Sequence, residues 1–259
     1  MLSSDFQIVK EFLDQKTTFY NTPEFIGDDP ISIPHSFTKK EDIEISAFFA
    51  ATLAWGKRCS TIRSAQKLIN LMDDSPFDFI SNFEENDLRR FEKFVHRTFN
   101  SDDCIFFMTS LQNIYKNHGG LENVFTAPGK LHDEVIFHSI VHFRQMFLQS
   151  AHMQRSEKHI SNPAKNATAK RLNMFLRWMV RQDSNGVDFG IWKSISPGQL
   201  ICPLDVHSGN SARKLGILTR KTNDWKAATE LTQNLRLFAP DDPVKYDFAL
   251  FGLGVFERF

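Results

Sequence analysis

The segment LICPLDVHSGNSARKLG, residues 200–216, carries the strongest local signal in the chain. An apolar run ends at a proline, an aspartate follows at position 205, and a helical pattern begins. Asp205 has the place of an N-cap, whose side-chain oxygen accepts a hydrogen bond from an amide of the first helical turn, and Gly216 has the place of the glycine that ends the helix. The aspartate is therefore either a cap alone or an acid that the chemistry of a site requires.

The bulk composition is that of a globular protein. The chain has 259 residues, of which 41% are hydrophobic and 24% charged, enough for one large or two smaller domains. No apolar run is as long as the about eighteen residues that a membrane helix needs. The N-terminus lacks the pattern of a signal peptide. The three cysteines form no CxxC pair, which predicts reduced thiols and no cysteine-ligated metal. We expect a monomer in the cytosol, with no cofactor, no metal and no membrane contact.

Helical periodicity dominates the chain, and alternation bounded by tight hairpin dipeptides is missing, so we expect an all-α fold. Two short helices are expected within residues 75–99. Longer helices are expected over 4–20, 42–55, 60–72, 102–117, 131–153 and 169–182. The polar stretch 154–168 predicts a boundary. It separates an N-terminal helical region, residues 1–154, from residues 155–259, with the two lobes interleaved.

The charge is distributed unevenly, although the net charge is zero. Between Arg155 and Lys221 there are twelve lysines and arginines against four acidic residues. A locally basic surface on a neutral protein is typical of a protein that binds a polyanion. The alternative is a charged face that only contacts solvent.

Residues 169–182, AKRLNMFLRWMVRQ, form an amphipathic helical pattern. One face carries Leu172, Phe175, Leu176, Met179 and Val180, and the opposite face carries Lys170, Asn173, Arg177 and Arg181. Lys170 falls in the first turn, where the helix dipole disfavours a cation, so we expect a lowered pKa for Lys170. An amine of this kind can act as a nucleophile or form a Schiff base. The alternative is an ordinary surface lysine.

The lysine helix and the aspartate turn together resemble the helix–hairpin–helix DNA glycosylases of the endonuclease III type. LDVHSGNSARKLG is similar to the aspartate turn of that superfamily, TAKRLNMFLRWMV to its lysine helix, and AFFAATLAWGKRCSTIRSAQKL to its first core helix. The resemblance covers roughly residues 45–259 and is nearest to the archaeal 8-oxoguanine glycosylase branch. Through CPLDVHSGN and KYDFALFGLGVF, the whole chain also resembles a bacterial family of unknown function.

The resemblance implies the two-lobed helical fold of that superfamily and a role in base-excision repair. The activity would be that of a DNA glycosylase with AP-lyase activity, acting on an oxidised purine such as 8-oxoguanine in double-stranded DNA. Lys170 would attack C1′ of the damaged nucleotide, while Asp205 would stabilise the cationic sugar and help to move protons. The damaged base must leave the stack to be reached.

The resemblance also implies walls for a base pocket. Asp247 and Phe251 lie four residues apart on the last helix, where that superfamily grips a flipped purine, and Met174 and Trp55 are further candidates. For Phe251 and Trp55 the alternative is ordinary core packing. Residues expected to contact DNA are Lys165, Thr168, Arg177, Arg181 and His207.

Two features depart from the superfamily. Its hairpin holds a phosphate through a Gly-x-Gly turn, but NPAKNATAK, residues 162–170, has no glycine. Phosphate would then bind to Lys165, Thr168 or helix N-terminal amides. Lys170 and Asp205 are also 35 residues apart, which is longer than usual.

Two alternative functions remain open at the level of sequence. One is a non-catalytic helical module that binds nucleic acid, and the other is an enzyme that uses the same amine on a different aldehyde or sugar. Convergence of Lys170 and Asp205 is the feature that a glycosylase requires.

Overall fold

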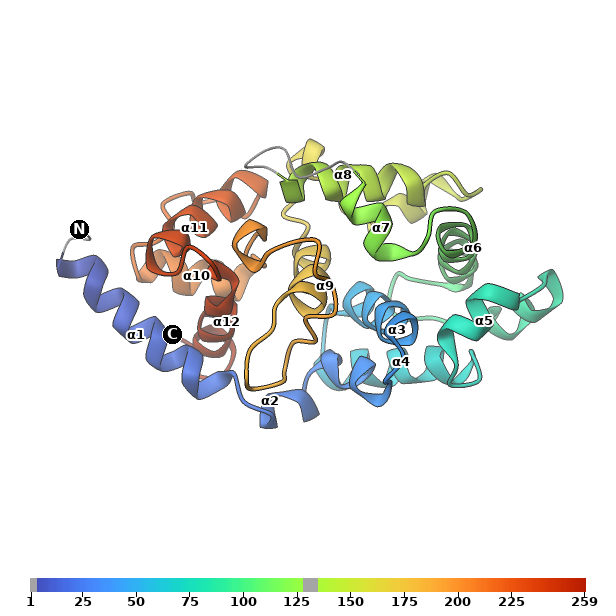
Figure 1. Ribbon diagram of the computed structural model, residues 1–259, viewed down its shortest axis with the longest axis horizontal. Coiled ribbons are helices and arrows are strands. Elements are labelled where there is room, and N and C mark those ends of the chain that lie inside the picture. The colour runs from blue at the N-terminus through green and yellow to red at the C-terminus, as the bar shows by residue number, and fades with distance from the viewer. Residues whose placement is uncertain (1–3, 128–134) are drawn as a thin grey trace. The chain divides into compact units, whose positions relative to one another are not determined.

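The computed structural model describes residues 4–127 and 135–259 (Figure 1). These residues form helices joined by loops, and a single isolated bridge pairs His96 with Phe99. The expected all-α class is confirmed for the described part of the chain. None of its helices combines the length and the apolar character that crossing a membrane would need.

The chain divides into two compact units. One, which we call the terminal unit, comprises the described residues 4–25 together with 162–259. The other, which we call the central unit, comprises residues 26–161 without the undescribed segment. The boundary expected after residue 154 lies close to residue 161, but the first helix belongs with the C-terminal part of the chain.

The central unit is built around phenylalanine. Its helices are α3 (Lys40–Leu53), α4 (Arg58–Asn70), α5 (Pro76–Asn82), α6 (Ser101–Asn117), α7 (Leu121–Thr126) and α8 (Val135–Phe147). Phe48, on the almost fully buried α3, has ring centroids of Phe107, Phe143 and Phe147 within 5.5–5.8 Å of its own. Aromatic pairs in stacked, tilted and edge-on arrangements like these stabilise a core beyond their buried area.

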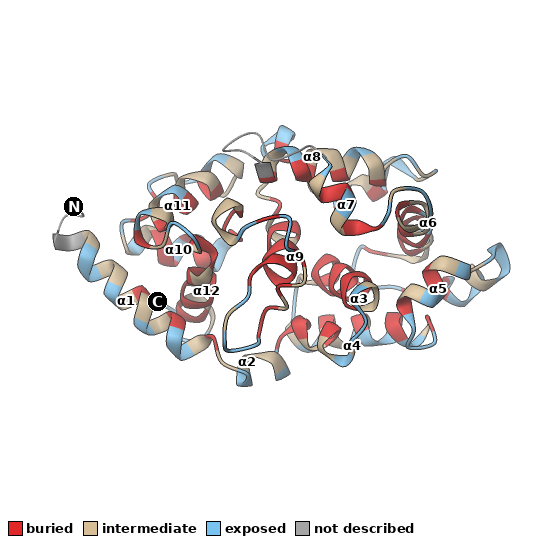
Figure 2. Ribbon diagram, in the orientation of Figure 1, coloured by how far each residue is buried: buried red, intermediate tan, exposed pale blue. Residues whose placement is uncertain are grey.

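The terminal unit contains α1 (Ser4–Tyr20), α9 (Lys170–Val180), α10 (Val206–Lys214), α11 (Trp225–Phe238) and α12 (Asp247–Val255). The short helix α2 (Glu24–Gly27) spans the boundary between the units. The apolar α12 packs against both α1 and α10 (Figure 1). Helix α9 is buried along almost its whole length (Figure 2).

Two glycines of α12 permit this close packing. A Cβ at Gly252 would lie 2.2 Å from the Tyr20 ring of α1, and a Cβ at Gly254 would lie 2.9 Å from the backbone carbonyl oxygen of His207 on α10. Because backbone atoms cannot move aside as a flexible side chain can, Gly254 fixes how closely α10 and α12 approach. This contact places the start of α10, and with it the aspartate turn.

Most of the expected helices are present. The helix expected over 4–20 is α1, and the one expected over 102–117 is α6, which begins one residue earlier. Of the helix expected over 131–153, residues 135–147 form α8, and residues 131–134 lie outside the described residues. Helix α11 was not predicted.

Candidate functional site

Asp205 caps α10, as its sequence position predicts. Its backbone is extended, with φ −128°, and its Oδ1 accepts hydrogen bonds from the amides of His207 and Ser208 at 2.9 and 3.0 Å. In return, the Asp205 amide donates to Oγ of Ser208 at 3.0 Å, which completes a capping box. Gly216 ends the helix with φ +71°.

A second group of residues holds the backbone of this turn. Nδ2 of Asn223 donates to the carbonyl oxygen of Asp205 at 3.0 Å, and Arg213 donates to Oδ1 of Asn223. Gly209 allows this approach, because a Cβ there would lie 2.8 Å from Oδ1 of Asn223. Asp205 is therefore fixed through both its side chain and its peptide group.

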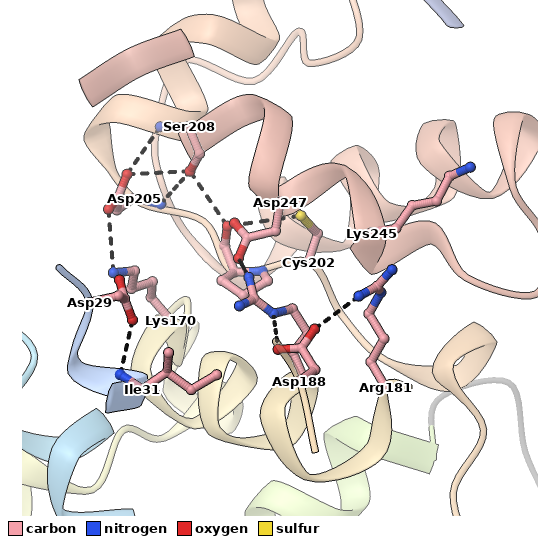
Figure 3. Close-up of polar contacts among 12 residues, drawn as sticks. Asp29, Ile31, Lys170, Arg181, Asp188, Cys202, Asp205, Ser208, Lys245 and Asp247 are labelled. Carbon is pink, nitrogen blue, oxygen red and sulfur yellow. Dashed lines mark hydrogen bonds and ion pairs between the residues drawn. The ribbon is translucent and has the colours of Figure 1, made fainter. Parts of the chain in front are cut away.

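Lys170 is the first residue of α9, and its Nζ lies 3.5 Å from Oδ2 of Asp205 (Figure 3). The two side chains are 25% and 29% exposed, so solvent reaches both of them. The fold thus brings together an amine and a carboxylate that are 35 residues apart in sequence. The capping amides hold Oδ1 of Asp205, and Oδ2 is the oxygen that faces the amine.

The electrostatic surroundings keep Asp205 ionised. Burial would raise the pKa of Asp205, but the charge of Lys170 and the amide hydrogen bonds from Ser208 and His207 outweigh it, and the pKa falls below its ordinary value of 3.8. Asp205 is therefore a carboxylate at neutral pH. A carboxylate of this kind can stabilise a nearby cation but is a poor proton donor.

Arg177 and Arg181 do not face solvent, which corrects the expectation that they contact DNA. Their exposures are 4% and 3%. Arg177 pairs with Asp188 and Asp247. Arg181 pairs with Asp188 (Figure 3), and also with acids at positions 183 and 242. Both arginines lie on the side of α9 opposite its apolar face, and that side faces other parts of the terminal unit. Carboxylates there neutralise the two guanidinium groups.

Asp247 lies at the start of α12 and pairs with Arg177. Burial raises the pKa of Asp247 to about 6, while the charges of Arg177 and Lys170 act in the opposite direction. Its side chain is 10% exposed. Asp247 is thus part of a buried ion-pair network, which differs from the open wall of a base pocket. Phe251 is half-buried beside Phe25 and Phe256.

The remaining candidates occupy different environments. Met174 is buried, Thr168 is half-buried, and Lys165 and His207 are exposed. Trp55 belongs to the central unit, where its ring stacks on His159 and meets His96 edge-on. Its burial there is intermediate.

Three residues of the site were not found from the sequence. Ser208 stands three residues after Asp205, a capping-box spacing that could have identified it. Asn223 and Asp188 lie in loops, and no local pattern connects them to Asp205 or to α9. Across residues 4–127 and 135–259, the structure contains no group of three or more histidine, cysteine, aspartate or glutamate side chains placed to hold a metal ion.

The comparisons with known proteins identify a family. No curated protein and no solved structure matches the chain. Residues 29–256, which are most of the chain, match the model of the family described as "Protein of unknown function (DUF2400)". The chain belongs to this DUF2400 family.

Proposed function

We propose that this protein is a DNA glycosylase with AP-lyase activity, acting on an oxidised purine such as 8-oxoguanine in double-stranded DNA. The observation that carries the proposal is the 3.5 Å approach of Nζ of Lys170 to Oδ2 of Asp205, with both groups accessible to solvent. A nucleophilic amine beside an ionised carboxylate is the pair that cleavage of a glycosidic bond followed by Schiff-base formation needs.

The proposed reaction begins with loss of the damaged base. Nζ of Lys170, in its neutral form, bonds to C1′ as the bond between C1′ and the base nitrogen breaks, and the base leaves with the bonding electrons and takes up a proton. The sugar carries positive charge at that stage, and the Asp205 carboxylate stabilises it. The low pKa of Asp205 favours this electrostatic role over proton donation.

Strand cleavage would follow from the same adduct. The C1′–O4′ bond opens as O4′ takes its electrons and one of the two protons on the attached nitrogen, which leaves a protonated imine between C1′ and Nζ. A proton then leaves C2′, and the 3′ phosphate departs with the C3′–O electrons. Each step uses Lys170 as the covalent partner. The fixed cap keeps Oδ2 of Asp205 beside the amine while the sugar changes its charge.

Phosphate contacts would come from lysines near the loop before α9. The amide of Trp225 donates to the carbonyl oxygen of Asn166 at 3.1 Å, which joins this loop to the segment before α11. Lys165 and Lys221 lie exposed on these two joined segments. The amides of His207 and Ser208 at the start of α10 already bind Asp205.

Borohydride trapping tests the proposal. Wild type, Lys170→Gln, Asp205→Asn and the control Lys226→Gln are incubated with duplexes that carry 8-oxoguanine or an abasic site. We expect a covalent protein–DNA band from wild type and Lys226→Gln and none from Lys170→Gln. Base release by Asp205→Asn should fall by about a hundredfold or more, as when one charge-stabilising group is removed from other active sites.

Two outcomes would refute the proposal. If no lesion gives a band while duplex binding is intact, Lys170 is a phosphate contact, and the protein is a non-catalytic nucleic-acid-binding module. If neither a band nor duplex binding is observed, the lysine–aspartate pair acts on an aldehyde or sugar outside DNA, or has no covalent role.

A further inference from the structure

The residue before Lys170 has an unusual backbone conformation. Ala169 lies in the left-handed region, at φ +50° and ψ +32°, and is 1% exposed. Glycine and asparagine visit this region readily, whereas the Cβ of other residues clashes with the backbone there. Asn166, three residues earlier, is also left-handed, at φ +62°, and is a residue type that tolerates the conformation. Ala169 is not.

Asn173, one turn after Lys170, holds this conformation in place. Its Nδ2 donates to the carbonyl oxygen of Thr168 at 3.0 Å, across the Ala169 peptide, and its own amide donates to the carbonyl oxygen of Ala169 at 2.9 Å. The Asn173 side chain is 1% exposed, and its Oδ1 has no hydrogen-bond partner among the residues the structure describes. A buried acceptor without a partner is destabilising.

Two unfavourable features thus flank Lys170. One is the left-handed backbone of Ala169, just before it, and the other is the buried Oδ1 of Asn173, three residues after it. If this helix start served the fold alone, glycine at position 169 would lower the backbone strain. Backbone strain of this kind persists where the surrounding structure enforces it and concentrates at functional sites. The strained peptide sets the direction of the Cα–Cβ bond of Lys170, and Nζ of Lys170 ends 3.5 Å from Oδ2 of Asp205.

We propose that Ala169 and Asn173 are positioning residues that aim the Lys170 amine at its target. The inference rests on the proposed function, because it assigns a purpose to the direction of Lys170. The restraint works through rigidity. Alanine in the left-handed region, tied at Thr168, has few alternative conformations, and the amine therefore starts from one direction rather than several.

Ala169→Gly separates this role from a structural one. Glycine relieves the strain, so the melting temperature should be retained or raised, by up to about 4 °C for a chain of this size. At the same time the rate of borohydride trapping should fall about tenfold or more, because small misplacements of a reacting group cost rate steeply. Stability and trapping rate move together if Ala169 has only a structural role.

Asp74→Gly is the matched control. Asp74 is also left-handed, at φ +53°, and it is exposed in the central unit. Its replacement also puts glycine at a left-handed position, away from Lys170 in the sequence, and should leave trapping unchanged. Asn173→Ala, which frees the Thr168 carbonyl, should slow trapping as Ala169→Gly does.

A second readout does not depend on activity. Reductive methylation with ¹³C-formaldehyde labels the lysines, and Lys170→Arg assigns the Lys170 methyl resonance. We expect the methyl order parameter of Lys170 to be lower in Ala169→Gly than in wild type and to be unchanged in Asp74→Gly.

The outcomes distinguish the two proposals. If wild type traps DNA and Ala169→Gly traps at the same rate, or slows only with a matching loss of melting temperature, the positioning role is refuted. If wild type traps no lesion, the proposed function fails, and the NMR measurement decides alone. An equal order parameter in wild type and Ala169→Gly would then overturn the positioning role, and a lower one in Ala169→Gly would support it without a glycosylase.

Discussion

Replacing Asp205 by asparagine and by alanine should separate its charge from its role as a cap. Asparagine caps helices as well as aspartate does, so Asp205→Asn keeps an oxygen for the amides of His207 and Ser208, which lie 2.9 and 3.0 Å from Oδ1. It loses only the charge that faces Lys170. Asp205→Ala loses both.

The magnitudes follow from the geometry. The Lys170–Asp205 pair is 25% and 29% exposed, and partly exposed pairs contribute at most about 1 kcal/mol. Asp205→Asn should therefore lower the free energy of unfolding by about 1 kcal/mol or less. Loss of the cap should cost Asp205→Ala about 1 kcal/mol more. Base release should fall by the same factor in both variants, because both lack the carboxylate charge.

Urea unfolding and a base-release assay on the same three proteins provide the test. The expected pattern is unequal stability with equally reduced activity. If base release instead follows stability, so that Asp205→Asn stays active while Asp205→Ala does not, Asp205 is a cap alone and the reasoning is wrong.

Three further predictions concern the surroundings of the site. Arg177→Met leaves the buried Asp247 carboxylate without this cation, and urea unfolding should show a loss of about 3–5 kcal/mol. Because the pKa of Asp247 is raised from 3.8 to about 6, the folded state binds the proton more tightly. As the pH rises from about 4 to 6, the wild-type free energy of unfolding should therefore fall relative to that of Asp247→Asn, by up to about 1.4 kcal/mol per pH unit. A slope of opposite sign would contradict the raised pKa of Asp247. Gly254→Ala places a Cβ 2.9 Å from the His207 carbonyl oxygen and should cost about 1–3 kcal/mol. Gly27→Ala, with nothing within 4 Å, is its control in the same unfolding experiment.

Local signals were sufficient to predict the elements of the site. A cap followed by a helix and a closing glycine identified the turn at Asp205, and the cap at Asp205 and the left-handed Gly216 are both present. The periodicity of residues 169–182 likewise predicted α9, and α9 begins at Lys170. These features depend on hydrogen bonds within a few residues, which a sequence encodes directly.

The surroundings of α9 could not be predicted in this way. A helical wheel separates apolar from charged positions, and it predicts that the charged side is available to contact DNA. Arg177 and Arg181 instead meet acids such as Asp188, in the loop after the helix, and Asp242. Such pairing depends on which helix a loop contacts in the folded chain, and helical periodicity carries no information about that contact.

The left-handed Ala169 was also invisible in the sequence. Glycine or asparagine would have indicated such a conformation, but alanine gives no local sign of it. The conformation is enforced from outside, through the bond from Asn173 to Thr168. Residues 162–170 contain no glycine, yet Asn166 and Ala169 both take left-handed conformations.

In the proposed reaction, the Lys170 amine forms the covalent bond to the sugar. The most direct measurement is mass spectrometry of the borohydride-reduced adduct after digestion of both protein and DNA. We expect a reduced deoxyribose remnant on the peptide that contains Lys170. A remnant on the N-terminal amine or on any other lysine would contradict it.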